Sequence, residues 1–294
     1  MKPPSDRYVL LTAARNEEAN IERTIEAVLS QNQLPAKWII VSDGSTDRTD
    51  AIVTGYTAKN QFVELVSFSG DELRNFGSKA KSVNFGYKRL RGISHAFVGN
   101  LDADVSFDPD YYKNILSRFG ENRKLGIAGG VRYDLDHGQF RRVRSARNSV
   151  GGPFQFFRRE CFEEIGGYLP LKYGGIDAAA EITARMYGWE VQSFPEYRVY
   201  HYRRTGTASR NLAKSIIRKG IRDHMIGYHP LFQLLRCMVR WNERPYFISS
   251  ILWFTGFLWA TLRRMNRPVS DEFVKFVRSE QMKRLRSLQL WRLG

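Results

Sequence analysis

Short apolar runs alternate with segments of helical periodicity through the first 131 residues, and this alternation constrains the fold more than any other feature. Repeated strand-then-helix units are typical of a mostly parallel sheet with helices on both faces. The expected strands are Tyr8–Ala14, Lys37–Ser42, Phe62–Phe68, His95–Leu101 and Leu125–Val131. The expected helices are Ile21–Ser30, Thr49–Thr57, Ser78–Leu90 and Asp108–Phe119, the last with Asp108 as N-cap and Pro109 at its first position. The sequence therefore predicts an α/β fold.

The pattern is looser after Arg132. Tyr133–Gly152 is polar and basic without clear periodicity, and it predicts a mobile loop. Further along we expect a strand at Pro153–Arg158 and helices at Glu160–Ile165, Asp177–Tyr187 (ended by Gly188), Ser209–Tyr228, Leu231–Trp241 and Asp271–Trp291. We thus predict an α/β domain over residues 1–205 and a helical, basic and apolar C-terminal region over 206–294.

The positive charge is concentrated in the last third of the chain. With 43% hydrophobic and 26% charged residues, the composition is that of a folded globular protein, and the formal net charge is +16. From His201 onward there are 19 Lys and Arg against 5 Asp and Glu, whereas the first 200 residues hold 27 against 25. Such asymmetry indicates a polyanionic partner, which would be nucleic acid, an anionic membrane surface or a phosphorylated substrate. The alternative is a solvated basic face without a partner.

An uncharged run, Tyr246–Leu262, favours the membrane among these partners. As a helix, its 17 residues would be about 25 Å long, slightly short for an upright span. Arg240 and Arg244 precede the run and Arg263, Arg264 and Arg267 follow it, so a helix in the membrane interface or a re-entrant hairpin fits better than a span. A buried core helix is the alternative. Nucleic acid is disfavoured because no zinc-finger or RNP pattern accompanies the charge.

Polar groups follow three of the expected strands, at Thr12–Glu17, Asp43–Asp47 and Asp102–Asp104. In open α/β sheets, ligands bind outside the carboxyl ends of the strands, so these groups predict a binding site at one edge. In extended chain the carboxylates of Asp102 and Asp104 point the same way. Mg²⁺ and Mn²⁺ prefer oxygen ligands, and Mg²⁺ commonly combines one or two carboxylates with substrate phosphates.

Four further residues are candidates, each with an ordinary alternative. Lys79 near a helix start suits a diphosphate but is equally an exposed lysine. Asp177 stands at the start of an expected helix, where it is either an N-cap or a general base. Glu181 lies one turn further along, on the same face of that helix. His201, after an expected strand, is a candidate third metal ligand, although most lone histidines are not ligands.

Several segments in series resemble the family 2 glycosyltransferases of GT-A fold. They are LLTAARNEEANIERTIEAVLSQ, WIIVSDGSTDRT, SKAKSVNFGY and NLDADVSF, followed by FRRECFEEIGGY and GGIDAAAEITARMYGWEV. They stand in the family's order over roughly residues 8 to 205. The resemblance implies a GT-A domain over 1–205, with a nucleotide half over about 1–105 and an acceptor half over about 106–205.

The resemblance also implies roles for individual residues. Ala13, Glu17 and Asp43 would line the nucleoside pocket, Lys79 would approach the diphosphate, and Asp102, Ala103 and Asp104 match the Asp-x-Asp motif, with Asp104 the closer metal ligand. His201 matches a histidine near metal and diphosphate. Asp177 matches the aspartate of the family's Glu-Asp base motif, but Ile176 stands in place of the Glu, which leaves Glu181 as the alternative base.

The implied activity is an inverting, Mn²⁺- or Mg²⁺-dependent transfer from a nucleotide-diphosphate sugar, with UDP expected ahead of GDP. The Gln-x-x-Arg-Trp motif of processive synthases is absent, which favours transfer of one sugar to a hydroxyl or phosphate of a lipid-linked or cell-envelope glycan acceptor. The N-terminus has no apolar signal core and only two cysteines occur, so we expect the cytoplasmic membrane face, reached through about 246–262. Because Ile176 replaces the family's usual Glu, an inactive partner protein that binds a nucleotide sugar remains an alternative. The positive charge alone would also fit a nucleic-acid-binding protein.

Overall fold

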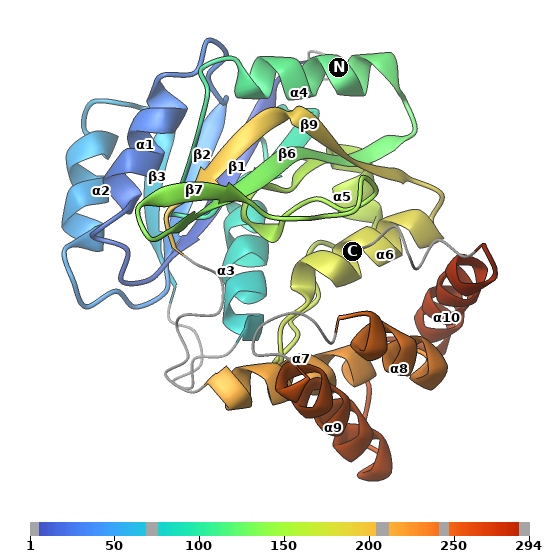
Figure 1. The fold of residues 1–294 in the computed structure, drawn as a ribbon. Helices are drawn as coiled ribbons and strands as arrows, with labels where there is room; N and C mark the ends of the chain where they lie inside the picture. Colours follow the sequence, from blue (N-terminus) through green and yellow to red (C-terminus); the bar gives the residue numbers. More distant parts are fainter. Residues whose placement is uncertain (1–5, 69–75, 204–211, 241–246, 288–294) are drawn as a thin grey trace. The chain divides into compact units, whose positions relative to one another are not determined.

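The computed structural model describes residues 6–68, 76–203, 212–240 and 247–287 (Figure 1). The chain divides into two compact units, the first comprising Met1–Pro170 and Ile176–Arg204 and the second Leu171–Gly175 and Thr205–Gly294. The first unit is a mixed α/β structure around one sheet, and the second consists of helices.

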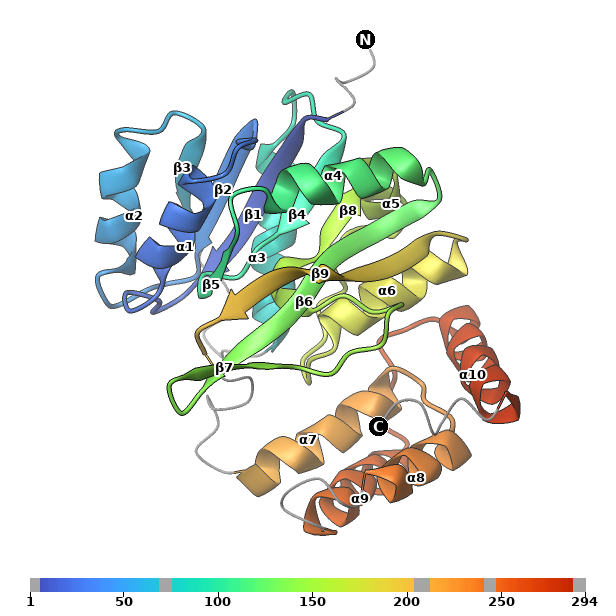
Figure 2. The same cartoon turned by 45° about the horizontal axis from the view of Figure 1, so that its top comes forward.

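The sheet of the first unit has the strand order β3-β2-β1-β4-β8-β6-β9-β5, with β7 paired to β6 (Figure 2). The strands are β1 (Tyr8–Ala14), β2 (Lys37–Ser42), β3 (Val63–Ser67), β4 (Phe97–Asn100), β5 (Val105–Phe107), β6 (Leu125–Asp136), β7 (Gln139–Arg142), β8 (Phe156–Arg158) and β9 (Glu190–His201). The helices are α1 (Ile21–Leu29), α2 (Thr49–Thr57), α3 (Phe76–Arg89), α4 (Tyr111–Glu121), α5 (Arg159–Glu164) and α6 (Ile176–Met186), with a 3-10 turn at Gly152–Phe154.

The sheet, predicted to be mostly parallel, is parallel in one half and mixed in the other. The pairs β2–β3, β1–β2 and β1–β4 are all parallel. Beyond β4 the pairs β4–β8, β6–β8, β6–β7 and β5–β9 are antiparallel, and only β6–β9 is parallel. The parallel half gathers the ends of β2, β1 and β4 at one edge, which is where a ligand is expected.

Helices cover both faces of the sheet, as predicted. On β1 the side chains alternate between faces. Leu11 faces α3, because a methyl group built on Gly86 of that helix would lie 3.1 Å from a Leu11 methyl. Tyr8, on the other face, has its ring 4.8 Å from that of Tyr112 in α4. The sheet is therefore buried on both sides, and its strands read as continuous apolar runs.

Two predictions for this unit were wrong. Tyr133–Gly152 is not simply a loop, because β6 continues to Asp136 and turns back as β7 through His137 and Gly138, whose φ values are +49° and +80°. A two-residue loop with two positive φ values is the tight connection that suits strand twist. Helix α4 begins at Tyr111 with Asp110, not Asp108, as its N-cap residue. The carbonyl of Asp108 instead accepts hydrogen bonds from Tyr111 and from the Gln31 side chain.

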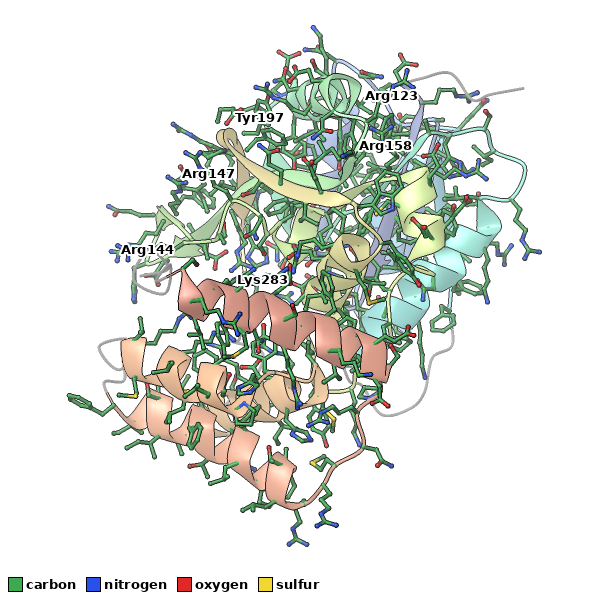
Figure 3. The ribbon with its side chains drawn as sticks, turned by 90° about the vertical axis from the view of Figure 1, so that its right-hand side faces the viewer. Arg123, Arg144, Arg147, Arg158, Tyr197 and Lys283 are labelled. Carbon is green, nitrogen blue, oxygen red and sulfur yellow. The ribbon has the colours of Figure 1, made fainter. Side chains whose placement is uncertain are left out.

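A half-buried arginine, Arg158, hydrogen-bonds to carbonyl groups at the C-terminal end of α4 (Figure 3). Its guanidinium donates to the carbonyl oxygens of Phe119 and Asn122 at 2.9 and 3.2 Å. It also lies 5.3 Å from the Phe119 ring centroid, which adds a cation–π contact. Carbonyls at the end of a helix lack partners within the helix, so this arginine supplies a donor to the carbonyl of the buried Phe119. The Asn122 carbonyl also accepts from the Leu125 backbone.

The second unit contains helices α7 (Leu212–Met225), α8 (Pro230–Val239), α9 (Ile248–Leu262) and α10 (Asp271–Arg286). The expected helices are present, although their predicted ends at Ser209, Trp241, Tyr246 and Trp291 lie outside the described residues. Ile221 and Met225 of α7 form a buried cluster with Ala260 of α9.

Glycines let α7 and α9 approach backbone to backbone. A methyl group on Gly220 would lie 2.0 Å from the carbonyl oxygen of Trp253, and one on Gly256 would lie 2.1 Å from that of Ile217. Such distances are far inside van der Waals contact, so either substitution must push the helices apart.

We predict that Gly256→Ala lowers the free energy of unfolding by about 1–3 kcal/mol or more through overpacking. Gly55→Ala is the matched control, because Gly55 is exposed in α2 with nothing within 4 Å of its added methyl group. That change should be neutral or stabilise by about 0.5–1 kcal/mol. Urea denaturation followed by circular dichroism measures both, and a Gly256→Ala protein as stable as wild type would contradict the close crossing.

Candidate functional site

The site lies where β4 ends and the chain crosses to β5. Asp102, Ala103 and Asp104 form this connection, and Val105, the first residue of β5, pairs with His201 at the end of β9. On its other side His201 pairs with Asp134 of β6. The sheet register therefore brings together residues that are about 30 to 100 positions apart in sequence.

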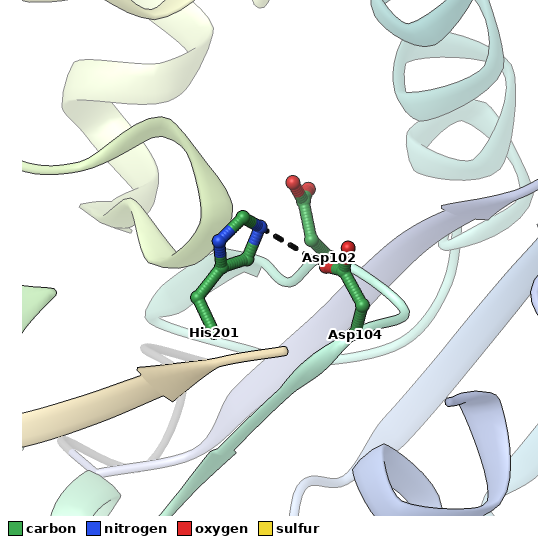
Figure 4. A group of neighbouring side chains, drawn as sticks. All are labelled: Asp102, Asp104 and His201. Carbon is green, nitrogen blue, oxygen red and sulfur yellow. Dashed lines mark ion pairs between the residues drawn. The ribbon is translucent and has the colours of Figure 1, made fainter. Parts of the chain in front are cut away.

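Asp102, Asp104 and His201 form the cluster that could hold a metal ion (Figure 4). One ligand atom from each lies within 4.8 Å of the others. Asp104 and His201 are both buried, and Asp102 is half-buried. These three are the residues that the sequence predicts as metal ligands, and the structure brings all of them together.

The donor set of this cluster fits a divalent cation. His201 Nδ1 lies 3.0 Å from Asp134 Oδ1, so we assign the ring proton to Nδ1, which donates to that carboxylate. The lone pair on Nε2 then faces Asp104 Oδ1 at 3.4 Å, and this buried oxygen has no hydrogen-bond donor among the described residues. A carboxylate that orients a histidine through its other nitrogen is typical of metal sites.

Charge repulsion acts on the two aspartates. Burial raises the pKa of Asp104 above its usual range, and the neighbouring Asp102 carboxylate raises it further. Arg203 and Lys79 act in the opposite direction. Lys79, in the first turn of α3, forms an ion pair with Asp102. The ammonium group of Lys79 therefore lies beside the predicted metal ligands.

Glu17 lies on the loop after β1 and joins the same charge network. Arg203 donates to Glu17 Oε2 at 2.6 Å, and its Nε lies 3.9 Å from Asp104 Oδ2. Burial raises the pKa of Glu17 to about 7, Arg203 opposes the rise, and the carboxylates of Asp104 and Asp102 add to it. Glu17 is thus placed at the cluster rather than only in a nucleoside pocket.

Hydrogen bonds join the loop after β1 to the loop after β2 and to the first residue of α2. The backbone N–H of Glu17 donates to Thr49 Oγ1 at 2.8 Å, and that of Thr46 donates to Asn16 Oδ1 at 2.8 Å. Asn16 adopts a positive φ of 55°, which Asn tolerates better than most residues. The two loops are therefore fixed relative to each other before any ligand binds.

Ala13 and Asp43, which the sequence assigns to the nucleoside pocket, lie at these strand ends. Ala13 is half-buried and pairs with Val41. The backbone N–H of Asp43 donates to the Ala14 carbonyl, and its carboxylate lies 3.8 Å from Arg15. Asp43 and Ala103 are both buried. The first two positions border the edge where β1 and β2 end.

The two acidic candidates for a general base differ in environment. Asp177, in the first turn of α6, is half-buried and touches Gly152, where a methyl group would lie 2.9 Å from Asp177 Oδ2. Glu181 is buried, and its Oε1 accepts hydrogen bonds from the Val150 backbone at 2.6 Å and from Gln155 at 3.1 Å. Burial raises the pKa of Glu181 to about 8. A buried carboxyl already bonded to its own chain favours a structural role for Glu181.

Sequence reasoning missed two members of the site, Asp134 and Arg203. Asp134 fell within the segment predicted to be a loop, and only the β6–β9 register shows that it faces His201. Arg203 follows His201 by two residues, and that spacing was the one signal available in the sequence. Arg132, which lies 3.0 Å from Asp134, belongs to the same strand.

Comparison with known proteins gives a family match and a shared fold. The family model described as Glycosyl transferase family 2 matches residues 10–172, which is more than half of the chain. The poly-beta-1,6-N-acetyl-D-glucosamine synthase of Staphylococcus epidermidis is 26% identical over 206 residues, which are 63% of this chain and 47% of that protein. The chain thus spans about half the length of this curated relative.

Solved structures show the same fold. The mannosyltransferase PcManGT from Pyrobaculum calidifontis, solved with GDP-Man and Mn²⁺, superposes with a TM-score of 0.57 at 16% identity over 99% of this chain and 81% of that one. TarS of S. aureus with UDP-GlcNAc gives a TM-score of 0.56 at 15% identity, over 86% of this chain and 71% of that one. At these identities the likeness shows the fold alone.

We predict that Glu181→Gln removes a pH dependence of stability. The wild-type carboxyl holds its proton up to about pH 8 when folded but only to about 4.5 when unfolded, so stability falls as pH rises through this window. The slope is at most about 1.4 kcal/mol per pH unit. In the variant, the amide oxygen of the new side chain could accept both hydrogen bonds.

Thermal melts at pH 5, 6, 7, 8 and 9 measure the difference between the two proteins. The Gln variant should gain stability relative to wild type as the pH rises to about 8, and the difference should level off above that pH, where the folded wild-type carboxyl is ionised as well. A constant difference across this range would show that Glu181 is charged in the folded protein.

Proposed function

The chain belongs to glycosyl transferase family 2, and on that basis we propose that it is a metal-dependent inverting transferase that moves one sugar from a nucleotide-diphosphate sugar to an acceptor. The observation that carries this proposal is the convergence of Asp102, Asp104 and His201 beside Lys79. A cluster of two carboxylates and a histidine with an adjacent ammonium group suits a metal-bound diphosphate.

The charged groups of the site would stabilise the departing nucleotide. A divalent cation held by Asp102, Asp104 and His201, either Mn²⁺ or Mg²⁺, would supply positive charge to the diphosphate. Lys79 would add a second positive charge from the first turn of α3. Asp134 would hold His201 in one tautomer. Charge placed in advance where negative charge develops is a major source of rate enhancement.

Asp177 is the proposed general base. Its carboxylate would take the proton of the acceptor hydroxyl as that oxygen bonds to the anomeric carbon. The bond from the anomeric carbon to the diphosphate oxygen breaks on the opposite side, and the nucleoside diphosphate leaves with that electron pair, which inverts the configuration. Where the acceptor atom is a phosphate oxygen, it is already ionised and needs no base. Glu181 remains the alternative, which its buried hydrogen bonds disfavour.

The donor is proposed to carry UDP, with GDP as the second possibility. The structural neighbours point to both, since TarS was solved with UDP-GlcNAc and PcManGT with GDP-Man. Ala13, Glu17 and Asp43 would line the nucleoside pocket where β1 and β2 end.

Transfer of a single sugar is proposed although the curated relative is a polysaccharide synthase. The Gln-x-x-Arg-Trp motif is absent, and the nearest match is Gln233-Leu-Leu-Arg236-Cys237 in α8. Gln233 is fully buried and Arg236 lies 3.4 Å from the buried Asp223, so both are engaged within the helices.

The helical unit is proposed to bind the cytoplasmic face of the membrane. Among the described residues, no helix is long and apolar enough to cross a bilayer. Helix α9 instead exposes an apolar stripe and carries no charged residue. The stripe consists of Ile248, Ile251, Leu258 and Leu262, beside Trp259. Leu231, Leu234 and Met238 form a second exposed stripe on α8. An apolar face flanked by arginines suits a helix that lies in the interface of an anionic leaflet, where a lipid-linked acceptor would be found.

A second candidate function, nucleotide-sugar binding without transfer, rests on Ile176. This residue is buried at the start of α6, where the family usually has an acid. It predicts binding of a nucleotide sugar with no turnover.

We predict that Asp177→Asn lowers transfer by about 10²- to 10⁴-fold while leaving nucleotide affinity unchanged. Glu181→Gln is the matched control on the same helix and should retain transfer. Release of nucleoside diphosphate from UDP-GlcNAc and GDP-Man, with bacterial membrane lipid extract as acceptor, measures the rate. Loss of transfer in Glu181→Gln but not in Asp177→Asn would reverse the assignment, and absence of turnover in wild type with intact binding would favour the second candidate.

We predict that Ile251→Glu with Leu258→Glu reduces cosedimentation with phosphatidylglycerol vesicles about tenfold or more, because two apolar side chains are lost and negative charge is added. Leu34→Glu is the control, since Leu34 is 48% exposed but lies in the α/β unit. Equal binding of all three proteins would contradict the docking face.

A further inference from the structure

A segment of the α/β unit carries positive charge without any negative charge. Residues 137–159 contain six arginines and no aspartate or glutamate. The charge asymmetry of the whole chain hides this segment, because it lies in the nearly neutral first 200 residues. Neither the metal cluster nor the membrane-docking face uses it.

The fold places one end of this segment at the metal cluster. Arg141 of β7 pairs with Asp134 of β6, the residue that holds His201. Directly paired residues of antiparallel strands share a face of the sheet, so Arg141 lies on the His201 side. Arg142 pairs with Tyr133 and lies on the opposite face.

The other end of the segment reaches the proposed base. The Gly152 carbonyl accepts a hydrogen bond from the Asn100 side chain, and the Pro153 carbonyl accepts one from the backbone of Asp102. Gly152 also touches Asp177. The segment therefore runs from the residue that orients His201 to the residue proposed to deprotonate the acceptor.

Backbone contacts hold the segment while its arginines stay exposed. Val143 donates to the Arg132 carbonyl at 2.8 Å, and the Arg147 carbonyl accepts from the Ser193 backbone at 2.8 Å. Arg141, Arg144 and Arg147 are exposed (Figure 3 labels the last two). Within the described part of the chain, Arg144 and Arg147 form no ion pair, and Arg141 has one weak partner, Asp136, at 3.8 Å.

We propose that Arg141, Arg144 and Arg147 bind a phosphate group carried by the acceptor, an inference that rests on the proposed transferase function. Guanidinium groups are the side chains best suited to phosphate, because they donate paired hydrogen bonds in a fixed plane. The donor's diphosphate already has Lys79 and the metal cluster on the α3 side of the site. The arginines instead lie on the segment that runs from β7, paired with Asp134, to Gly152, which touches Asp177, the proposed base for the acceptor.

The test measures binding of two phosphate probes to the full chain saturated with UDP and Mn²⁺. Dodecyl phosphate represents a lipid-borne phosphate, glycerol 3-phosphate represents a water-soluble one, and dodecyl glucoside is an uncharged control.

By calorimetry, the triple variant R141Q/R144Q/R147Q should bind dodecyl phosphate about thirtyfold or more weakly than wild type. Arg142→Gln, the matched control on the opposite face of β7, should change it by less than about twofold. If the wild type binds dodecyl phosphate but not glycerol 3-phosphate, the acceptor is lipid-linked. If it binds both with equal affinity, the acceptor is water-soluble.

Other outcomes would overturn the proposal. The proposal is wrong if wild type and the triple variant bind dodecyl phosphate with equal affinity. It is also wrong if Arg142→Gln lowers this affinity as much as the triple variant does. Loss of UDP affinity in the triple variant would assign the arginines to the donor. Loss of phosphatidylglycerol vesicle binding with unchanged dodecyl phosphate affinity would make them a membrane contact. A wild-type chain that binds no nucleotide would instead refute the proposed function itself.

Discussion

Two carboxylates, Asp102 and Asp104, lie close together at the edge of the sheet with a single residue between them, and the structure around them is arranged to balance their charge. Asp104 is buried and carries a raised pKa, because burial and its neighbour both oppose ionisation. Lys79 from α3, His201 from β9 and Arg203 after β9 each bring positive charge or a ligand atom to the pair. Without such partners, a buried carboxylate beside a second, half-buried one would destabilise the fold.

The sheet makes this arrangement possible because its two halves differ. The parallel half, β3-β2-β1-β4, ends its strands at one edge, so the loops that follow them meet there. The mixed half supplies groups from the other direction, since β9 ends at His201 between β5 and β6. The β6–β7 hairpin then extends this half with Asp134 on the site and Arg141 beside it. The site therefore combines residues from separate parts of the chain.

The local sequence pattern predicted many of the helices and strands well. Features that depend on pairing between distant strands could not be predicted from it. Tyr8–Ala14, Lys37–Ser42 and Thr49–Thr57 have the predicted bounds, because apolar runs and helical spacing are local properties. Asp102 and Asp104 were predictable from their position after a strand. Asp134 was not, because its role depends on a pairing with His201, 67 residues away. The prediction that Asp108 caps α4 was wrong, because hydrogen bonds from Gln31 and Tyr111 hold the Asp108 carbonyl in a turn before the helix.

The central claim is that Asp102, Asp104 and His201 hold a divalent cation that completes a nucleotide-diphosphate site. The most direct measurement is the melting temperature of wild type and Asp104→Asn with UDP or GDP, each with and without Mn²⁺. A ligand that binds only the folded state raises the melting temperature. The account predicts that one diphosphate raises it in wild type only when Mn²⁺ is present, and that Asp104→Asn loses this rise while remaining folded. A rise of equal size without metal, or in Asp104→Asn, would contradict it.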